Sequence, residues 1–459
     1  MGGLSAALNI SVGALQVDEN ALATSSNNVA NVDTPGYSRQ VANLVETAPI
    51  TLGNITFGTG VGLQSVTSTR DSILDLRVNQ ETQQQGQLDA FIGAGQQIQS
   101  LFDQTSGAGL QGPLTAFFNS LSQLSANPSD TNTRQAVLTA AQNLATAFNQ
   151  SSVNLSTLQG STDQSVTQTV GQINTLTAQI AAVNTQISGT TGAGQNPGPL
   201  VDQRQLLINQ LSNLVDVSEI NAGNNSLTLT TSSGAPLVVG GQSFALSTQV
   251  NAATGQQDVF SQGTDITTKI TSGQLAGQIQ IRDQEIPALQ NSLDTLAFNF
   301  ANAVNTQNEA GFDLNGNAGG AIFVPPTAQA SAAAGLTVAI TNPALIAASQ
   351  DGTTGDNANA NALLALQNTN IVSGQTPLNY YSGIVFKIGN DVSSAQTSEQ
   401  TGSAVLQQIQ NLQGGVSGVS VNEEAANLIR FQSAYEASAE VSNAVNTLLQ
   451  DTIGILGAA

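Results

Sequence analysis

Apolar residues at the start of the chain recur every seventh position, which is typical of one face of a helix. They are Leu8, Leu15, Leu22 and Val29, with Leu4 and Val12 beside them. The pattern stops at residues 33–36, Asp-Thr-Pro-Gly, where proline and glycine favour the end of a helix. The sequence therefore predicts a first helix of about thirty residues.

The last segment of the chain shows a similar stripe. Ser420 and Glu423 have the spacing of a capping box, in which the serine oxygen accepts the Glu423 N–H and the carboxylate turns back to the helix start. Apolar or small side chains follow at steps of three or four residues, with an occasional longer step. They are Leu428, Phe431, Tyr435, Val441, Val445, Leu448, Thr452 and Ile455. A second long helix is predicted from there almost to the last residue.

A long helix with so thin an apolar stripe is only marginally stable by itself in water. Both ends of the chain therefore need a partner surface. Two arrangements fit the spacing. The terminal helices either form an ordinary bundle within one chain, which the spacing favours, or form a seam that joins subunits, which the spacing leaves open.

Helical periodicity recurs between the two ends. Residues 71–102 and 114–158 are predicted to be helical, separated by breaks near Gly107 and Pro113. Residues 173–187 carry apolar side chains at alternating steps of three and four, the spacing of a coiled-coil seam.

The second half of the chain is more varied. A Gly- and Pro-rich break at residues 189–199 leads into a leucine stripe that begins at Leu200. Another helix is expected after Pro287, because proline is favoured in the first turn of a helix. Residues 309–360 are expected to be rich in loops.

Residues 216–285 have a different character. Leu227 to Thr230 alternates Leu with Thr, Ser233-Gly234 suits a turn, and Leu237 to Val239 follows, so we predict strand, turn and strand. The predicted fold is mainly α with a β-rich insertion, in an elongated molecule whose N- and C-terminal helices pair as a coiled coil. The predicted domains are a terminal coiled-coil domain at 1–45 and 421–459, a helical body at 46–215 and 286–420, and a small outer β domain at 216–285.

The composition removes most catalytic chemistry. The 459 residues include 9 Lys+Arg against 30 Asp+Glu, for a formal net charge of −21, and contain no Cys and no His. The chain therefore offers no thiolate, no imidazole base and no cysteine-ligated metal. So few cations on an acidic chain suit neither a nucleic acid nor an anionic membrane as partner. We expect no catalytic residue, no metal site and no cofactor.

The remaining carboxylates give weak signals. Asp313 begins a segment similar to a calcium loop, but the glycine and glutamate that such a loop needs at its sixth and twelfth positions are missing. Glu423 and Glu424 suit the positive end of the last helix better than they suit a paired acid and base. Asp283 and Glu285 would share one side of a strand, with no cleft defined around them.

Residues 25–39, SSNNVANVDTPGYSR, resemble the N-terminal signature of the bacterial flagellar axial proteins, the family of rod, hook and hook-associated proteins. In that family the first helix ends in an Asn-rich stretch, followed by a turn and Gly-Tyr-x-Arg. The matching positions are Asn27, Asn28, Ala30, Asn31, Gly36, Tyr37 and Arg39. Three further segments, at 200–217, 307–319 and 416–441, are similar to those of hook-associated junction proteins.

The resemblance implies a fold and a location. In this family the two terminal helices associate as an axial coiled coil, a helical body surrounds them, and a β-rich domain faces outward. It also implies an extracellular place in the flagellum, reached as an unfolded chain through the flagellar type III export apparatus without a cleaved signal peptide. Longer relatives carry a further outer domain after the Ala-Gly-Phe-Asp loop at 310–313, so one outer domain is expected here.

The resemblance also implies partners. They are other copies of the chain in a ring or helical assembly, the flagellar hook protein, a second hook–filament junction protein, and an export chaperone that binds the C-terminal helix. The expected interface residues are Leu8, Leu15, Leu22, Asn27, Asn28, Val29, Asn31, Gly36, Tyr37, Arg39, Leu428, Phe431, Tyr435, Val441, Val445, Leu448 and Ile455.

Three hypotheses follow for the function. The first is a non-enzymatic structural subunit that joins hook to filament and polymerises through its terminal helices. The second is another flagellar axial protein, such as hook protein or flagellin. The third is a secreted hydrolase with a carboxylate pair hidden in residues 216–285.

Overall fold

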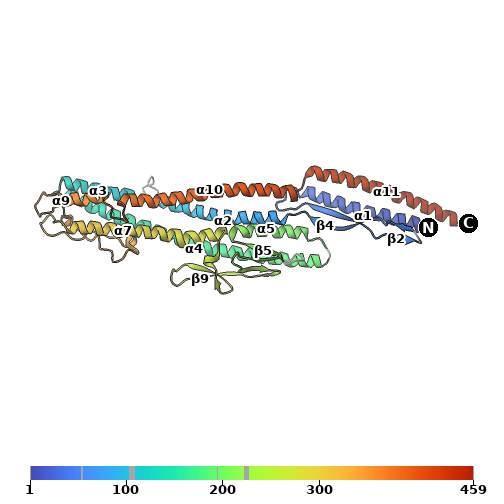
Figure 1. Cartoon of the computed structure of the whole chain (residues 1–459), viewed down its shortest axis with the longest axis horizontal. Coiled ribbons are helices and arrows are strands. Elements are labelled where there is room, and N and C mark those ends of the chain that lie inside the picture. Colours follow the sequence, from blue (N-terminus) through green and yellow to red (C-terminus); the bar gives the residue numbers. More distant parts are fainter. Residues whose placement is uncertain (1, 53–54, 103–108, 194, 222–226, 458–459) are drawn as a thin grey trace. The chain divides into compact units, whose positions relative to one another are not determined.

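The computed structural model describes residues 2–52, 55–102, 109–193, 195–221 and 227–457, and it is mainly helical, as predicted (Figure 1). The chain divides into two compact units. Unit 1 comprises Met1–Gln83, Gln172–Leu246 and Gly402–Ala459, and unit 2 comprises Gln84–Gly171 and Ser247–Thr401. No helix in the described ranges has an apolar stretch long enough to cross a bilayer.

The helices and strands have the following bounds. The α-helices are α1 (Gly2–Ala30), α2 (Ser72–Leu101), α3 (Gln111–Ala126), α4 (Thr131–Gly192), α5 (Gly198–Leu214), α6 (Gly273–Gln280), α7 (Ile286–Glu309), α8 (Ala332–Gly335), α9 (Ala358–Ala365), α10 (Pro377–Ser417) and α11 (Val421–Gly457). The short helical segments are η1 (Thr267–Lys269), η2 (Ile281–Glu285), η3 (Pro343–Leu345) and η4 (Leu366–Asn368). The strands are β1 (Gln40–Glu46), β2 (Ile50–Leu52), β3 (Ile55–Phe57), β4 (Val61–Ser68), β5 (Ser218–Asn221), β6 (Leu227–Thr230), β7 (Pro236–Val239), β8 (Gln242–Ser243), β9 (Leu246–Val250), β10 (Gln257–Ser261) and β11 (Thr264–Asp265).

Both terminal helices are present at the predicted places. Helix α1 ends at Ala30, just before the Asp-Thr-Pro-Gly turn, and α11 begins at Val421, directly after the predicted capping serine. The Glu423 N–H donates to Oγ of Ser420 at 3.4 Å, which is the first half of the capping box. The two helices pack along each other within unit 1 (Figure 1). The prediction that the two terminal helices form a bundle within one chain is therefore confirmed.

The prediction of one helix over 114–158 was wrong in its middle and at its C-terminal end. A break at 127–130 separates α3 from α4, because Pro128 cannot donate the backbone hydrogen bond that a helix interior needs. Helix α4 is 62 residues long and includes the seam predicted at 173–187. Beyond residue 158 the buried Thr162 and Thr169 occupy core-facing positions between its apolar residues. The break expected near Gly107 lies outside the described residues.

The described part of unit 1 contains three antiparallel sheets. Strand β1 pairs with β4 as a ribbon against α1, and β2 pairs with β3. The sequence pattern predicts no strand in residues 40–68. Strands β5 to β8 form a sheet in sequence order, and β6, the turn at Ser233-Gly234 and β7 confirm the predicted strand–turn–strand unit.

In unit 1 the seam of α4 has polar contacts through two asparagine side chains as well as apolar ones. Ile173, Ile180 and Ile187 are fully buried, as the predicted seam requires. Asn174 exchanges two hydrogen bonds of 2.8 Å with the backbone of Leu246. Asn184 donates to the carbonyl of Gly240 at 2.8 Å and accepts from Arg204 at 3.0 Å. These bonds join α4 to the first residue of β9 and to the turn between β7 and β8.

Unit 2 is built around an aromatic core. Phe117 and Phe118 of α3 meet Phe300 of α7 edge to face, with ring centroids 5.5 and 6.0 Å apart, and Phe323 packs on the same cluster. The predicted stripe after Pro287 is buried in this core. Residues 309–360 are mostly loops, as predicted, with only short helical segments.

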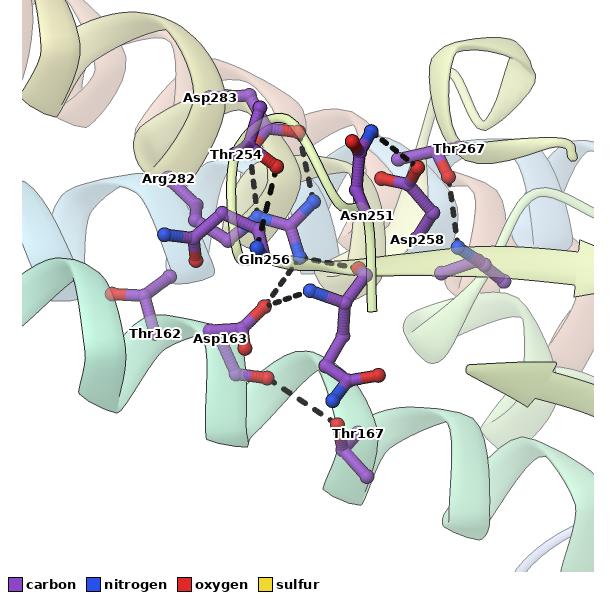
Figure 2. Close-up of polar contacts among 12 residues, drawn as sticks. Thr162, Asp163, Thr167, Asn251, Thr254, Gln256, Asp258, Thr267, Arg282 and Asp283 are labelled. Carbon is purple, nitrogen blue, oxygen red and sulfur yellow. Dashed lines mark hydrogen bonds and ion pairs between the residues drawn. The ribbon is translucent and has the colours of Figure 1, made fainter. Parts of the chain in front are cut away.

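A buried arginine joins three elements of unit 2 (Figure 2). The Arg282 side chain is fully buried, and its Nη1 lies 2.7 Å from Oδ1 of Asp163 on α4 and 2.6 Å from the carbonyl oxygen of Gln257 on β10. Its Nε also donates to Asp283 at 2.6 Å. Residues 281–285 form a π-helical segment between α6 and α7, so the prediction that Asp283 and Glu285 share one side of a strand was wrong. The insertion that widens this turn carries Arg282 into the core.

Candidate subunit interface

The apolar stripe predicted on α11 divides into an inner and an outer part. Leu428, Phe431 and Thr452 are half-buried and Val445 is buried, whereas the remaining stripe residues are exposed. The exposed fractions are 39% for Tyr435, 53% for Val441, 52% for Leu448 and 72% for Ile455. Val441, Leu448 and Ile455 are seven residues apart, so they lie on one face of the helix. We call these three residues the outer face of α11.

Helix α1 buries small and polar side chains more deeply than its predicted leucines. Leu8, Leu15, Leu22 and Val29 are half-buried. The buried positions of α1 are Ser11, Val17, Asp18, Ala21, Thr24, Ser25 and Asn28. Burial raises the pKa of Asp18, and a hydrogen bond from Ser438 of α11 partly offsets that effect. The inner contact between the terminal helices is therefore partly polar.

Asn28 organises the Asn-rich end of α1. Its Oδ1 accepts the hydroxyl of Tyr37 at 2.8 Å and the N–H of Gln40 at 2.9 Å, and its Nδ2 donates to the Gln40 carbonyl at 2.8 Å. Asn27 donates to the Tyr37 oxygen at 3.3 Å, and Asn31 donates to Asn27. These bonds fold the turn after α1 back against the start of β1.

The turn itself requires glycine at one position. Gly36 has φ +78°, in the left-handed region that L side chains rarely adopt. This conformation places Tyr37 beside Asn28 and leaves Ser38 and Arg39 to face other elements. The signature residues Asn28, Gly36 and Tyr37 are thus explained by one local turn.

Arg39 binds the start of the C-terminal helix. Its Nε donates to Oε1 of Glu424 at 2.7 Å, and its Nη1 lies 3.2 Å from Oε2 of Glu423. Its backbone N–H donates to the carbonyl of Ser417 at 2.8 Å. The Glu424 side chain is only 2% exposed. The interpretation of Glu424 as a carboxylate that only suits the helix N-terminus was therefore incomplete, because Glu424 is also the buried partner of Arg39.

Asp202 gives a structural role to part of segment 200–217, which resembles the hook-associated family. Its Oδ2 accepts the N–H of Ser38 at 3.0 Å, and its Oδ1 accepts Nη2 of Arg70 at 2.7 Å. Arg70 also donates to Oγ of Ser38 at 3.0 Å. Burial, with smaller contributions from the negative charges of Asp202 and Glu424, raises the pKa of Tyr37 to about 12. We call Asn28, Tyr37, Arg39, Asp202 and Glu424 the signature cluster.

The segment 307–319, which also resembles the hook-associated family, lies in unit 2. The hydrogen bonds of its Asp313 stay within one turn. Oδ1 of Asp313 accepts the N–H groups of Asn315 and Asn317 at 2.8 and 2.9 Å. Asp313 is buried, and its Oδ1 is bonded to the backbone of its own turn. Across the described ranges, no three acidic side chains come together in a way that would hold a metal ion.

The arrangement of the signature cluster could not be found from the sequence pattern. Asp202 and Arg70 were not singled out in the sequence analysis, and the only signal for Asp202 was its place in a segment similar to the hook-associated family. The cluster contains no nucleophile beside a base, and its charged groups are paired with one another. Its geometry holds α1, β1, α5 and α11 together, which is a structural task.

Comparisons with known proteins agree with this geometry. Family models match at residues 95–323 (flagellar hook-associated protein FlgK helical domain), 8–37 (flagella basal body rod protein) and 413–455 (flagellar basal body rod FlgEFG protein C-terminal). The last two matches cover most of α1 and α11.

Relatives match over nearly the whole chain. The flagellar hook-associated protein 1 of Bacillus subtilis (strain 168) is 28% identical over 97% of both chains. That of Salmonella typhimurium is also 28% identical, over 98% of this chain and all of its own. The matched regions extend over 497 and 554 positions, more than the 459 residues of this chain, so both relatives contain insertions relative to it.

A solved structure supports the same fold. The flagellar hook junction protein FlgK from Burkholderia pseudomallei superposes with a TM-score of 0.66 at 20% identity, over 74% of this chain and all of its own. That likeness concerns the fold, whereas the sequence matches concern the family. This chain belongs to the flagellar hook-associated protein 1 family of bacterial flagellar axial proteins and is a structural component of the bacterial flagellum.

Proposed function

We propose that the chain is a structural subunit at the junction between flagellar hook and filament, and that it polymerises through its terminal helices. The names of its relatives and of the matching solved structure support the junction. The observation that carries the polymerisation is the outer face of α11. Val441, Leu448 and Ile455 stay exposed although the inner face of the same helix is already packed against α1.

A helix pair with one covered and one open apolar face suits a repeating assembly. The inner face keeps each chain folded, and the outer face becomes buried only when a neighbouring copy arrives. Head-to-tail contacts of this kind, repeated around an axis, generate a ring or a helical tube. In this proposal residues 1–45 and 421–459 form the axial part of each subunit, and the other ranges form the helical body and the outer β domain.

The finer partners belong to the same proposal. We propose contacts with the hook protein on one side and with a second junction protein on the other. Before assembly, an export chaperone would cover the outer face of α11, because an exposed apolar helix face otherwise favours aggregation. Export would follow the flagellar type III route to the outside of the cell.

We also propose that the chain is not an enzyme. Carboxylates within residues 216–285 contact other structural groups and not one another. Glu219 accepts from Asn79, Asp265 accepts the N–H of Thr267, and Asp283 binds Arg282. A hydrolase needs two carboxylates facing each other across a groove, so these contacts disfavour the hydrolase hypothesis. The match to a hook-associated helical domain disfavours hook protein and flagellin.

Deletion of the gene tests the proposal. Cells without this chain should carry bare hooks, release unassembled flagellin and fail to swim, and the restored chain should reverse all three effects. Immunogold labelling should place the protein in one band just above the hook. Intact filaments on the deletion strain would refute the junction role.

A further inference from the structure

A groove of about 600 Å³ in unit 1 runs beside strand β4. One wall is residues 63–68 with Arg70, and the other is residues 195–198 with Val201. Successive residues of a strand point to opposite faces, so a wall of six consecutive residues follows the strand's edge. Among the described residues, β4 pairs only with β1, so its other edge is open to this groove.

The groove also contains an unsatisfied polar atom. Oγ of Ser68, at the end of β4, is buried and has no hydrogen-bond partner. Gly198 in the opposite wall packs directly on this oxygen, because a Cβ there would lie 2.5 Å from it. Beside this closed end, the open strand edge is suited to an extended backbone, which supplies both donors and acceptors.

The hairpin of β2 and β3 is the matching element of the same chain. Ile50 pairs directly with Phe57 across it, and the two side chains are 42% and 49% exposed. A two-stranded hairpin of three-residue strands is at best marginally stable by itself in water. The cross-strand apolar pair therefore needs a covering surface that the strands themselves do not supply.

The charge distribution favours a second copy as the occupant. The hairpin segment 47–60 contains no Asp, Glu, Lys or Arg, and neither do residues 61–68 and 195–201 around the groove. Arg70, at the groove's end, is neutralised by Asp202 at 2.7 Å. Two copies with a net charge of −21 each repel at their charged surfaces. Contact between two uncharged surfaces avoids that repulsion.

We propose that the β2–β3 hairpin of one copy docks in the β4 groove of the next copy and extends its β1–β4 sheet by one strand. This inference rests on the proposed head-to-tail assembly and adds a second contact to it, separate from the outer face of α11. Backbone bonds along β4 give affinity, and the Ile50–Phe57 pair gives a defined register. Repetition of the contact joins each copy to its neighbour in one direction.

Disulfide cross-linking tests the docking directly, because the chain has no cysteine of its own. Thr56→Cys in the hairpin and Gln64→Cys in the groove are introduced together into the only copy in the cell. Both positions are exposed. Oxidation of isolated flagella should give a ladder of covalently joined chains. The matched control combines Thr56→Cys with Gln179→Cys, an exposed position on α4, and should stay monomeric.

The outcomes separate this inference from the proposed function. A ladder from the first pair alone supports the docking. Monomers from both pairs, in flagella that still carry filaments, overturn the docking and leave the junction role in place. Bare hooks in the deletion strain report on the junction role independently.

A charge variant gives a second measurement. Ile50→Asp with Phe57→Asp should reduce incorporation into flagella about tenfold or more, while the main melting transition of the purified chain stays unchanged because both side chains are exposed. Two facing aspartates also weaken the hairpin itself, so a milder pair of substitutions is needed beside them. Val153→Asp, at a 55% exposed position of α4, is the matched control and should incorporate normally. The milder pair Ile50→Thr with Phe57→Thr keeps β propensity. Full incorporation of both hairpin variants would overturn the docking.

Discussion

Arg39 and Glu424 are 385 positions apart in the sequence, yet Nε of Arg39 donates to Oε1 of Glu424 at 2.7 Å. The bond links the last residue of the N-terminal signature to the first turn of the C-terminal helix. Because the Glu424 side chain is 2% exposed and that of Arg39 is 25% exposed, the pair is largely shielded from water. It fixes the start of α11 to the segment that follows α1.

The first prediction concerns this pair. Arg39→Ala leaves a buried carboxylate without its partner, and breaking such a pair costs about 3 kcal/mol. Hydrogen exchange of the α11 amides should therefore become faster by about two orders of magnitude, with unit 2 unaffected. Glu423→Gln removes only the exposed partner and is the control, with a change below about 1 kcal/mol. Equal exchange rates in both variants would contradict the assigned role of Glu424.

The second prediction concerns alkaline pH. The pKa of Tyr37 is about 12 in the folded chain, against about 10 in an unfolded one. Below pH 10 the phenol is neutral in both states, and its contribution to stability is complete. Between about pH 10 and 12 the unfolded state loses its proton first, so this contribution is lost as pH rises.

Urea unfolding at a series of pH values measures this effect. The free energy of unfolding should fall with a steeper slope in the parent than in Tyr37→Phe above about pH 10. Near-ultraviolet titration should also show one late-ionising tyrosine fewer in the variant. Tyr381, whose pKa burial also raises, stays as the internal reference. Parallel slopes for the two chains would show that Tyr37 ionises normally.

The third prediction concerns Arg282. Arg282→Ala leaves Asp163 and Asp283 without the cation that both bind, and should destabilise unit 2 by about 3–5 kcal/mol. Arg282→Lys should restore little, because an ammonium cannot reproduce the planar set of donors that reaches Asp163, Asp283 and Gln257. Thermal unfolding and hydrogen exchange of β10 measure the effect. Full recovery with lysine would mean that charge alone matters at this site.

The fourth prediction separates the two faces of α11. The triple change of Val441→Ser, Leu448→Ser and Ile455→Ser alters only exposed positions, so the free chain should melt normally but fail to enter flagella. Val445→Ser alters a side chain that is 8% exposed and should instead lower stability by about 1–3 kcal/mol. Melting curves and immunoblots of isolated flagella distinguish the two. Normal motility of the triple variant would mean that the outer face is not a subunit contact.

The two terminal helices were predictable because a seven-residue apolar spacing over thirty positions depends on local sequence alone. The β1–β4 ribbon was not. Between the pairs Asn43–Ser65 and Leu44–Leu63 the register shifts, so Gln64 is an extra residue in β4 and interrupts the alternation of that strand. The sequence pattern of a strand is lost at such a bulge.

The signature cluster shows a different limit. The sequence marks Asn28, Tyr37 and Arg39 through a resemblance, but it does not say what they contact. Ser38 meets Asp202 across 164 positions, and no periodicity connects residues so far apart. The division of the α11 stripe into inner and outer residues was also invisible, because Val441 and Val445 lie only about 40° apart on the helix and packing buries one and leaves the other exposed.

The side-chain amides of Asn174 and Asn184 in α4 have a mechanical consequence for a structural component of the flagellum. Apolar side chains resist shear weakly, because a helix that slides by one turn, about 5.4 Å, finds equivalent neighbours at the new position. The hydrogen bonds of Asn174 to Leu246 and of Asn184 to Gly240 have no equivalent one turn away. These few directional hydrogen bonds therefore oppose axial sliding of α4 in unit 1.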